Sequence, residues 1–201
     1  MENIILGFLT GGSLILVIGP QNLFVIEQGL KKSFVFTVTT ICTISDIFLI
    51  FLGIFIYHIF SFISLEIEII LNIILILFLT KFVKDKIKDF KKNHKITKAN
   101  YSQNLKNIVL KTLGFTYLNP HVYSDTVFFL GNFSKNFFFI DKIYFGIGAS
   151  ISSFLFFFIL GYASNYFSKF LNNEKIWKLI NSFIILFMSG IIFYIIIDLF
   201  N

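Results

Sequence analysis

The sequence predicts an all-α integral membrane protein of about six transmembrane helices, and three observations support this fold class. Of the 201 residues, 56% are hydrophobic and 14% are charged, whereas soluble domains average about 25% charged residues. The apolar residues form long unbroken blocks, and a helix needs roughly 20 such residues to cross a bilayer. Six blocks with short loops use up the chain, so we expect one transmembrane domain over residues 1–201 and no soluble catalytic domain.

The apolar blocks, to within a few residues at each end, are 4–28, 34–60, 65–83, 109–132, 143–167 and 176–200. The third block is the weakest, because Glu66 and Glu68 lie at one end and Lys81 at the other. It either spans with these side chains reaching the headgroups or is re-entrant. The start of the first block has no basic region and no cleavage site, so we expect a mature helix there rather than a signal peptide.

The charge pattern predicts the orientation of the chain. The only long polar segment, 84–107, holds eight lysines against two aspartates. Basic loops mark the cytoplasmic side of a membrane protein, and they contact anionic lipid headgroups. We therefore read this basic charge as a topology signal and expect no nucleic-acid partner. Counting spans from this loop, Lys31 and Lys32 also fall inside, and both termini are predicted on the outer face.

The two prolines of the chain, Pro20 and Pro120, each interrupt an apolar block. Proline removes a backbone hydrogen bond and clashes with the preceding turn, so both blocks are expected to be broken helices. Freed backbone groups are tolerated at membrane depth only where protein or a water-filled cavity satisfies them. The residues beside the two prolines are Gly19, Gln21 and Asn22 in the first block, and Asn119 and His121 in the fourth.

The two breaks occupy matching places in the chain. Each falls in the first helix of a three-helix half, which gives repeat one over 1–83 and repeat two over 108–201, joined by the basic loop 84–107. With three spans in each half, the second half enters the membrane in the opposite sense. Broken helices at corresponding positions of two inverted repeats are typical of transporters and indicate a binding site near the membrane midplane.

Two carboxylates, Asp46 and Asp125, lie away from the ends of the apolar blocks. Asp46 is near the middle of the second block, where an ionised carboxylate costs roughly 2.5–3.5 kcal/mol on insertion scales. Asp125 follows His121 by four residues, so both lie on one helical face. An ionisable group inside the membrane is a functional hypothesis by default, and we expect both aspartates to line a polar path. Glu27 and Asp198 lie near helix ends and are expected at the interface.

The remaining patterns favour packing over chemistry. The single cysteine, Cys42, lies in an apolar block and is expected to be a small buried hydrophobe. Gly11, Gly146 and Gly148 are expected to allow close helix packing. We find no nucleophile–base pair and no metal or cofactor motif, so the sequence predicts neither an enzyme nor a bound metal or cofactor.

At these residues the sequence resembles the LysE family of amino-acid exporters, and within it the lysine/arginine exporter branch. The matching stretches are 18–25 (IGPQNLFV), 45–46 (SD) and 118–127 (LNPHVYSDTV), and weaker matches continue towards the last helix. The resemblance implies a six-segment exporter of the bacterial cytoplasmic membrane that exchanges amino acids for protons. Ser124 stands where this branch usually has Leu, a departure that leaves the proline and aspartate motifs intact.

The resemblance and the helix breaks together suggest how an amino acid would be held. Its carboxylate would meet freed backbone N–H groups beside the prolines, with Asn22 and Asn119 as further donors. Its cationic group would pair with Asp46 or Asp125, and an inbound proton would use the same carboxylates, with His121 as a possible relay. Such an exchange would cancel the electrical cost of exporting a cation, roughly 2.3 kcal/mol per 100 mV.

Other functions stay open at this point. The same scaffold would suit an exporter of neutral amino acids or of metal cations, and a membrane-embedded enzyme is a more distant alternative. The many Gly and Phe residues on helix surfaces would permit a homodimer.

Overall fold

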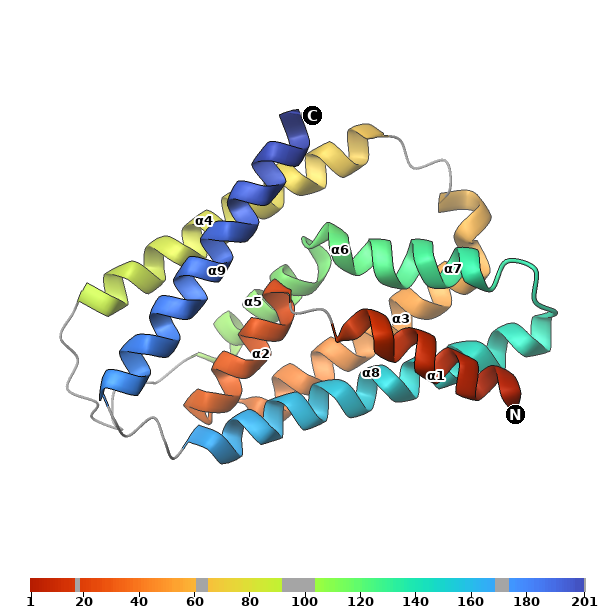
Figure 1. The fold of residues 1–201 in the computed structure, drawn as a ribbon, viewed down its shortest axis with the longest axis horizontal. Coiled ribbons are helices and arrows are strands. Elements are labelled where there is room, and N and C mark those ends of the chain that lie inside the picture. Colours follow the sequence, from red (N-terminus) through yellow and green to blue (C-terminus); the bar gives the residue numbers. More distant parts are fainter. Residues whose placement is uncertain (17–18, 61–64, 92–103, 169–173, 201) are drawn as a thin grey trace.

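The computed structural model describes residues 1–16, 19–60, 65–91, 104–168 and 174–200. Within these ranges the chain is helical apart from short turns and contains no strand (Figure 1). This agrees with the predicted all-α class. Residues 92–103 of the basic loop lie outside the described residues, as do the side chains of Glu66, Glu68 and Asp198.

The first apolar block forms two helices, α1 (Glu2–Ile15) and α2 (Pro20–Lys31), which meet at an angle of 82°. Gly19 is extended and Pro20 is the first residue of α2, where its missing N–H and fixed φ suit a helix start. The side-chain Nδ2 of Asn22 donates to the carbonyl of Ile15 at 3.2 Å. The predicted break is present, and a side chain from its second half satisfies a carbonyl at the end of its first half.

The fourth block is broken in the same way. It consists of α5 (Leu105–Tyr117), α6 (Pro120–Tyr123), the π-helix η1 (Ser124–Phe129) and α7 (Leu130–Phe133). The hydroxyl of Tyr123 donates to the carbonyl of Tyr117 at 2.9 Å, again joining the second half to the end of the first.

The long helices are α3 (Val35–Phe60), α4 (Leu65–Lys91), α8 (Phe139–Phe167) and α9 (Glu174–Phe200). By length and composition, three described segments can cross a membrane: Val35–Ile56, Phe139–Phe167 and Lys178–Ile197. The bent pair of α1 and α2 is a fourth candidate. Helix α4 is not among these candidate spans, because it contains several charged residues. The segment from α5 to α7 is not among them either, because it is interrupted. The chain is therefore a membrane protein, and the arrangement of six spans as inverted repeats stays a prediction.

Helix α8 is the centre of the packing, because α1, α2 and α3 all lie against it (Figure 1). Small residues permit the closest of these contacts, as predicted. A Cβ added to Gly11 would lie 3.0 Å from the Cα of Ala149, and one added to Gly148 would overlap the backbone of Ile4. Helices α4 and α9 pack mainly against each other and lie side by side along one flank.

Lysine residues lie at one end of the molecule. The end of α2, the start of α5, the end of α8 and the start of α9 lie together on the left of Figure 1. We call this the basic end, because Lys31 and Lys106 lie there. At the opposite end, the side chain of Asn3 donates to Asp141 at 2.6 Å, which ties the N-terminus to the start of α8.

Candidate functional site

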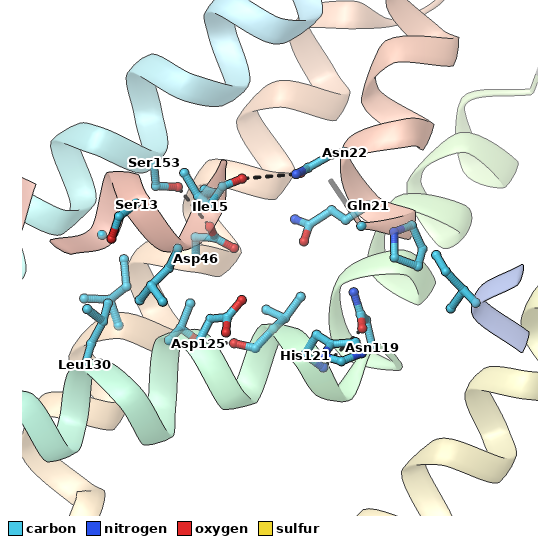
Figure 2. A pocket seen from close by; sticks show the side chains of 18 of the residues that line it. Ser13, Ile15, Gln21, Asn22, Asp46, Asn119, His121, Asp125, Leu130 and Ser153 are labelled. Atoms are coloured by element: carbon cyan, nitrogen blue, oxygen red, sulfur yellow. Dashed lines mark hydrogen bonds between the residues drawn. The ribbon is translucent and has the colours of Figure 1, made fainter. Parts of the chain in front are cut away.

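A cavity of about 530 Å³ lies where the two helix breaks meet the middle of α3. Small-molecule sites commonly have volumes of about 300–1,000 Å³. Figure 2 shows side chains from both broken helices and from α3 pointing into it. The polar site residues predicted from the sequence all line this cavity: Gln21, Asn22, Asp46, Asn119, His121 and Asp125. Gly19 and Pro20 also line it, and Pro120 begins α6 directly after Asn119.

Helices α2 and α6 both begin at the cavity. The residues that precede them, Gly19 and Asn119, lie close together, since a Cβ added to Gly19 would be 3.9 Å from Nδ2 of Asn119. The Oδ1 atom of Asn119 accepts a hydrogen bond from the backbone N–H of His121 at 3.2 Å. The first turn of a helix has N–H groups without intrahelical partners and carries a partial positive charge. Two helix starts in one cavity therefore favour an anionic group between them.

Asp46 is buried in this cavity with only part of its hydrogen-bonding capacity used. Its side chain is 4% exposed, and Oδ2 accepts a hydrogen bond from Oγ of Ser153 on α8 at 3.0 Å. Gln21 lies close to Asp46, yet Nε2 of Gln21 and Oδ1 of Asp46 have no hydrogen-bond partner among the described residues. A buried carboxylate with one partner is costly to the fold unless a cation or a proton completes it. Asp46 is thus placed to hold either.

Asp125 reaches the cavity from the π-helix η1 and is half-buried. Its carboxylate interacts electrostatically with that of Asp46, and the two point into the same part of the cavity (Figure 2). His121 lies on the preceding helix and lines the same cavity. Single π-helical turns are rare and often occur at functional sites. Here the π-helix is held close to α3, since a Cβ on Gly53 would lie 2.5 Å from Cα of Val127.

The rest of the cavity wall is mostly apolar, apart from Ser13 and Thr126. Helix α9 contributes Leu186, Phe187, Gly190 and Ile191, facing the polar groups of α2, α3 and η1. A molecule with charged ends and an aliphatic chain would match such a surface. Its charged ends would contact the polar side chains, and its aliphatic chain would contact the apolar wall of α9.

Sequence reasoning missed three features of this site. Ser153 is the hydrogen-bond donor to Asp46. The sequence feature that could have identified it is a hydroxyl group inside an apolar block. The α9 wall had no polar residue to mark it, and the π-helix has no sequence pattern. Cys42 is fully buried, as expected. Glu27 lies in the last part of α2, where it is 2% exposed and forms an ion pair with Lys31. Its place at the membrane interface stays a prediction.

Comparison with known proteins decides the family. The model of the LysE type translocator family matches residues 12–199. The chain belongs to the LysE family. The predicted resemblance is therefore confirmed, and membership makes the chain a transporter of the bacterial inner membrane and not an enzyme. No solved structure matches the chain.

Similar proteins include three whose names describe arginine exporters. The arginine exporter protein ArgO of Pectobacterium atrosepticum is 33% identical over 187 residues, which is 92% of each chain. The ArgO protein of Klebsiella pneumoniae is 30% identical over 177 residues, covering 87% of this chain and 84% of its own. The ArgO protein of Salmonella typhimurium is 29% identical with the same coverage.

Proposed function

We propose that this LysE-family chain exports basic amino acids, arginine foremost, from the cytoplasm, and that the cavity between the broken helices is the substrate site. One observation carries the proposal: Asp46 and Asp125 share one cavity with the starts of α2 and α6. The cavity thus offers negative charge beside two helix starts, which matches the opposite charges of a basic amino acid. The names of the similar ArgO proteins support arginine as the substrate.

In this proposal the substrate lies across the cavity. Its α-carboxylate meets the first-turn N–H groups of α2, where the helix dipole favours an anion. At the start of α6 the N–H groups of His121 and Val122 already donate to Asn119, so α6 contributes the positive end of its dipole and neither of these donors. The guanidinium group pairs with Asp46 and Asp125, and a planar guanidinium can bind carboxylates through two parallel hydrogen bonds. The aliphatic chain between these charges contacts the apolar wall of α9, which includes Leu186 and Ile191.

Export of a cation needs a source of energy. Moving one positive charge out against an inside-negative potential costs roughly 2.3 kcal/mol per 100 mV. Inward movement of one proton for each substrate cancels this cost and leaves the pH gradient as the driver. Asp46 is suited to alternate between proton and substrate, because its Oδ1 has no protein partner among the described residues. His121 lies on the same wall as Asp125 and serves as a relay.

The proposal includes the topology read from the sequence. Residues 1–83 and 108–201 form two inverted repeats, and the basic loop 84–107 faces the cytoplasm, with both termini outside. The matching positions of the two breaks support the repeats, since each break is followed by a helix that begins with proline. Attachment of a reporter to either terminus, with its accessibility measured in intact cells, tests this topology.

Two alternatives use the same cavity. A neutral amino acid brings only its α-ammonium group, so one of the two carboxylates would lack a counter-charge, which is costly in a partly buried site. A bare metal cation is much smaller than a cavity of about 530 Å³. Among the described residues, no three His, Cys, Asp or Glu side chains gather closely enough to hold a metal ion. The site therefore favours the basic amino acid.

The test is efflux of labelled arginine and lysine from dipeptide-loaded bacterial cells that lack their own exporters. The wild-type chain should release both amino acids faster than an empty vector does, and Asp46→Asn should abolish the difference. Asp141→Asn is the matched control. Asp141 lies in the first turn of α8, where it accepts a hydrogen bond from Asn3, and the substitution is the same aspartate-to-asparagine change away from the cavity. Wild-type efflux no faster than the empty vector would refute the proposed substrate class.

A further inference from the structure

Four phenylalanine rings pack together on the side of the cavity that faces the basic end of the molecule. Phe24 on α2 stacks on Phe115 on α5, with ring centroids 4.8 Å apart and an interplanar angle of 26°. Phe82 on α4 packs edge-on against Phe115 at 4.9 Å, and Phe78, also on α4, does so at 4.8 Å. Phe24 and Phe115 are 1% and 0% exposed, so this aromatic cluster is tightly closed.

The aromatic cluster lies directly beyond the cavity. Phe24 follows Pro20 by four residues, and Phe115 precedes Asn119 by four residues. At 1.5 Å per residue, each ring originates roughly 6 Å from the cavity, on the side of the basic end. The amino group of Lys111 lies 5.9 Å from the centre of the Phe82 ring, so positive charge begins at the edge of the cluster.

The cluster joins parts of the fold that otherwise touch little. Helix α4 packs mainly against α9, and its aromatic contacts with α2 and α5 run through Phe78 and Phe82. Helix α9 in turn forms the apolar wall of the cavity. Movement of α4 away from α2 and α5 would therefore separate the rings and carry the cavity wall with it. Closed apolar contacts of this kind are discrete packing arrangements that favour a two-state change.

We propose that Phe24, Phe78, Phe82 and Phe115 form a gate that closes the cavity towards the basic end and opens when α4 separates from α2 and α5. This inference rests on the proposed transport function, because a gate needs a substrate to admit. A zwitterion with a charged side chain cannot cross the closed aromatic cluster, because the four rings carry no hydrogen-bonding group to replace its water. The gate is the point at which the substrate passes between the basic end and Asp46.

Cys42 provides a built-in probe of the gate. It is the only cysteine in the sequence, it is 0% exposed, and it packs in the same core as Phe24, Phe82 and Phe115. It precedes Asp46 by four residues on α3, which places it between the cavity and the basic end. Opening of the gate should therefore expose its thiol.

The experiment measures the rate at which a charged, membrane-impermeant methanethiosulfonate modifies Cys42 in inside-out vesicles, with Cys42→Ser as the blank. Phe115→Ala should raise this rate at least tenfold. Phe115→Leu, which keeps much of the volume but removes the ring contacts, should raise it about threefold and serves if the alanine variant folds poorly. Phe137→Ala is the control, because that ring packs with Phe133 and Phe145 at the opposite end and should leave the rate unchanged.

Three results decide the matter. Equal rates in the wild type and in both Phe115 variants would overturn the gate, and so would an equal rise in Phe137→Ala, which would indicate general loosening. A rise confined to the Phe115 variants supports it. Added arginine should also raise the wild-type rate by opening the gate. A variant effect without an arginine effect would support the gate while contradicting arginine as the substrate.

Discussion

Gly53 is the point of closest backbone approach that the glycines of α3 make to the π-helix that carries Asp125. A Cβ at this position would lie 2.5 Å from Cα of Val127, 2.6 Å from the Val127 carbonyl oxygen and 2.7 Å from that of Thr126. All three atoms belong to the backbone, so no side-chain rotation can relieve the overlap. The substitution Gly53→Ala must therefore move η1 away from α3.

The size of that movement follows from these distances. Ordinary contacts of a Cβ begin at 3.4 Å, so the backbone of η1 must shift by about 0.9 Å. Asp125 is next to Thr126 and should move with it. A misplacement of about 1 Å can lower the rate of a positioned step roughly 100-fold. Overpacking of this kind also costs about 1–3 kcal/mol of stability.

The assay compares arginine transport in proteoliposomes with the thermal stability of the purified protein. Gly53→Ala should lower transport 10- to 100-fold, with a fall in Tm of a few degrees. The control is Ile44→Ala, which lies on the same helix and is 61% exposed, and which should change neither quantity. Normal transport by a destabilised Gly53→Ala protein would refute the view that the position of η1 matters. Normal transport with normal stability would refute the close contact itself.

Three further substitutions test single groups of the cavity. Asp125→Asn removes one carboxylate while keeping its shape, and the arginine KM in proteoliposomes should rise at least tenfold; an unchanged KM would remove Asp125 from the site. Ser153→Ala removes a hydrogen bond to a charged group, worth about 1.5–3 kcal/mol, and should lower transport roughly tenfold, whereas Ser152→Ala should not. Asn119→Ala removes the acceptor of the His121 N–H and should lower stability by about 1 kcal/mol in a thermal melt. Asn119→Asp, which keeps an acceptor oxygen, should restore most of it.

The sequence predicted the helices and their breaks because those features depend on local chemistry. Long apolar blocks form helices in a membrane, since every backbone group must be satisfied within the segment. Proline cannot sit inside a regular helix, so α2 and α6 begin at Pro20 and Pro120. The polar residues beside these prolines were found for the same reason, and all of them line one cavity.

Features that depend on tertiary contacts could not be predicted in this way. The 82° angle between α1 and α2 follows from how both helices pack against α8. Helix α4 runs to Lys91, beyond the predicted end at residue 83, because charged residues continue a helix as readily as apolar ones. The π-helix and the bond between Ser153 and Asp46 arise from packing between segments far apart in the sequence.

The carboxylates of the cavity should select a cationic amino acid, and counterflow in proteoliposomes measures this selection. Proteoliposomes loaded with unlabelled arginine are diluted into labelled arginine or into labelled citrulline, which has nearly the same shape without the charge. Arginine should accumulate transiently, lysine should compete with it, and citrulline should accumulate little. Accumulation of arginine should be lost in Asp46→Asn but not in Asp141→Asn. Equal accumulation of citrulline and arginine, or full activity of Asp46→Asn, would contradict this selection.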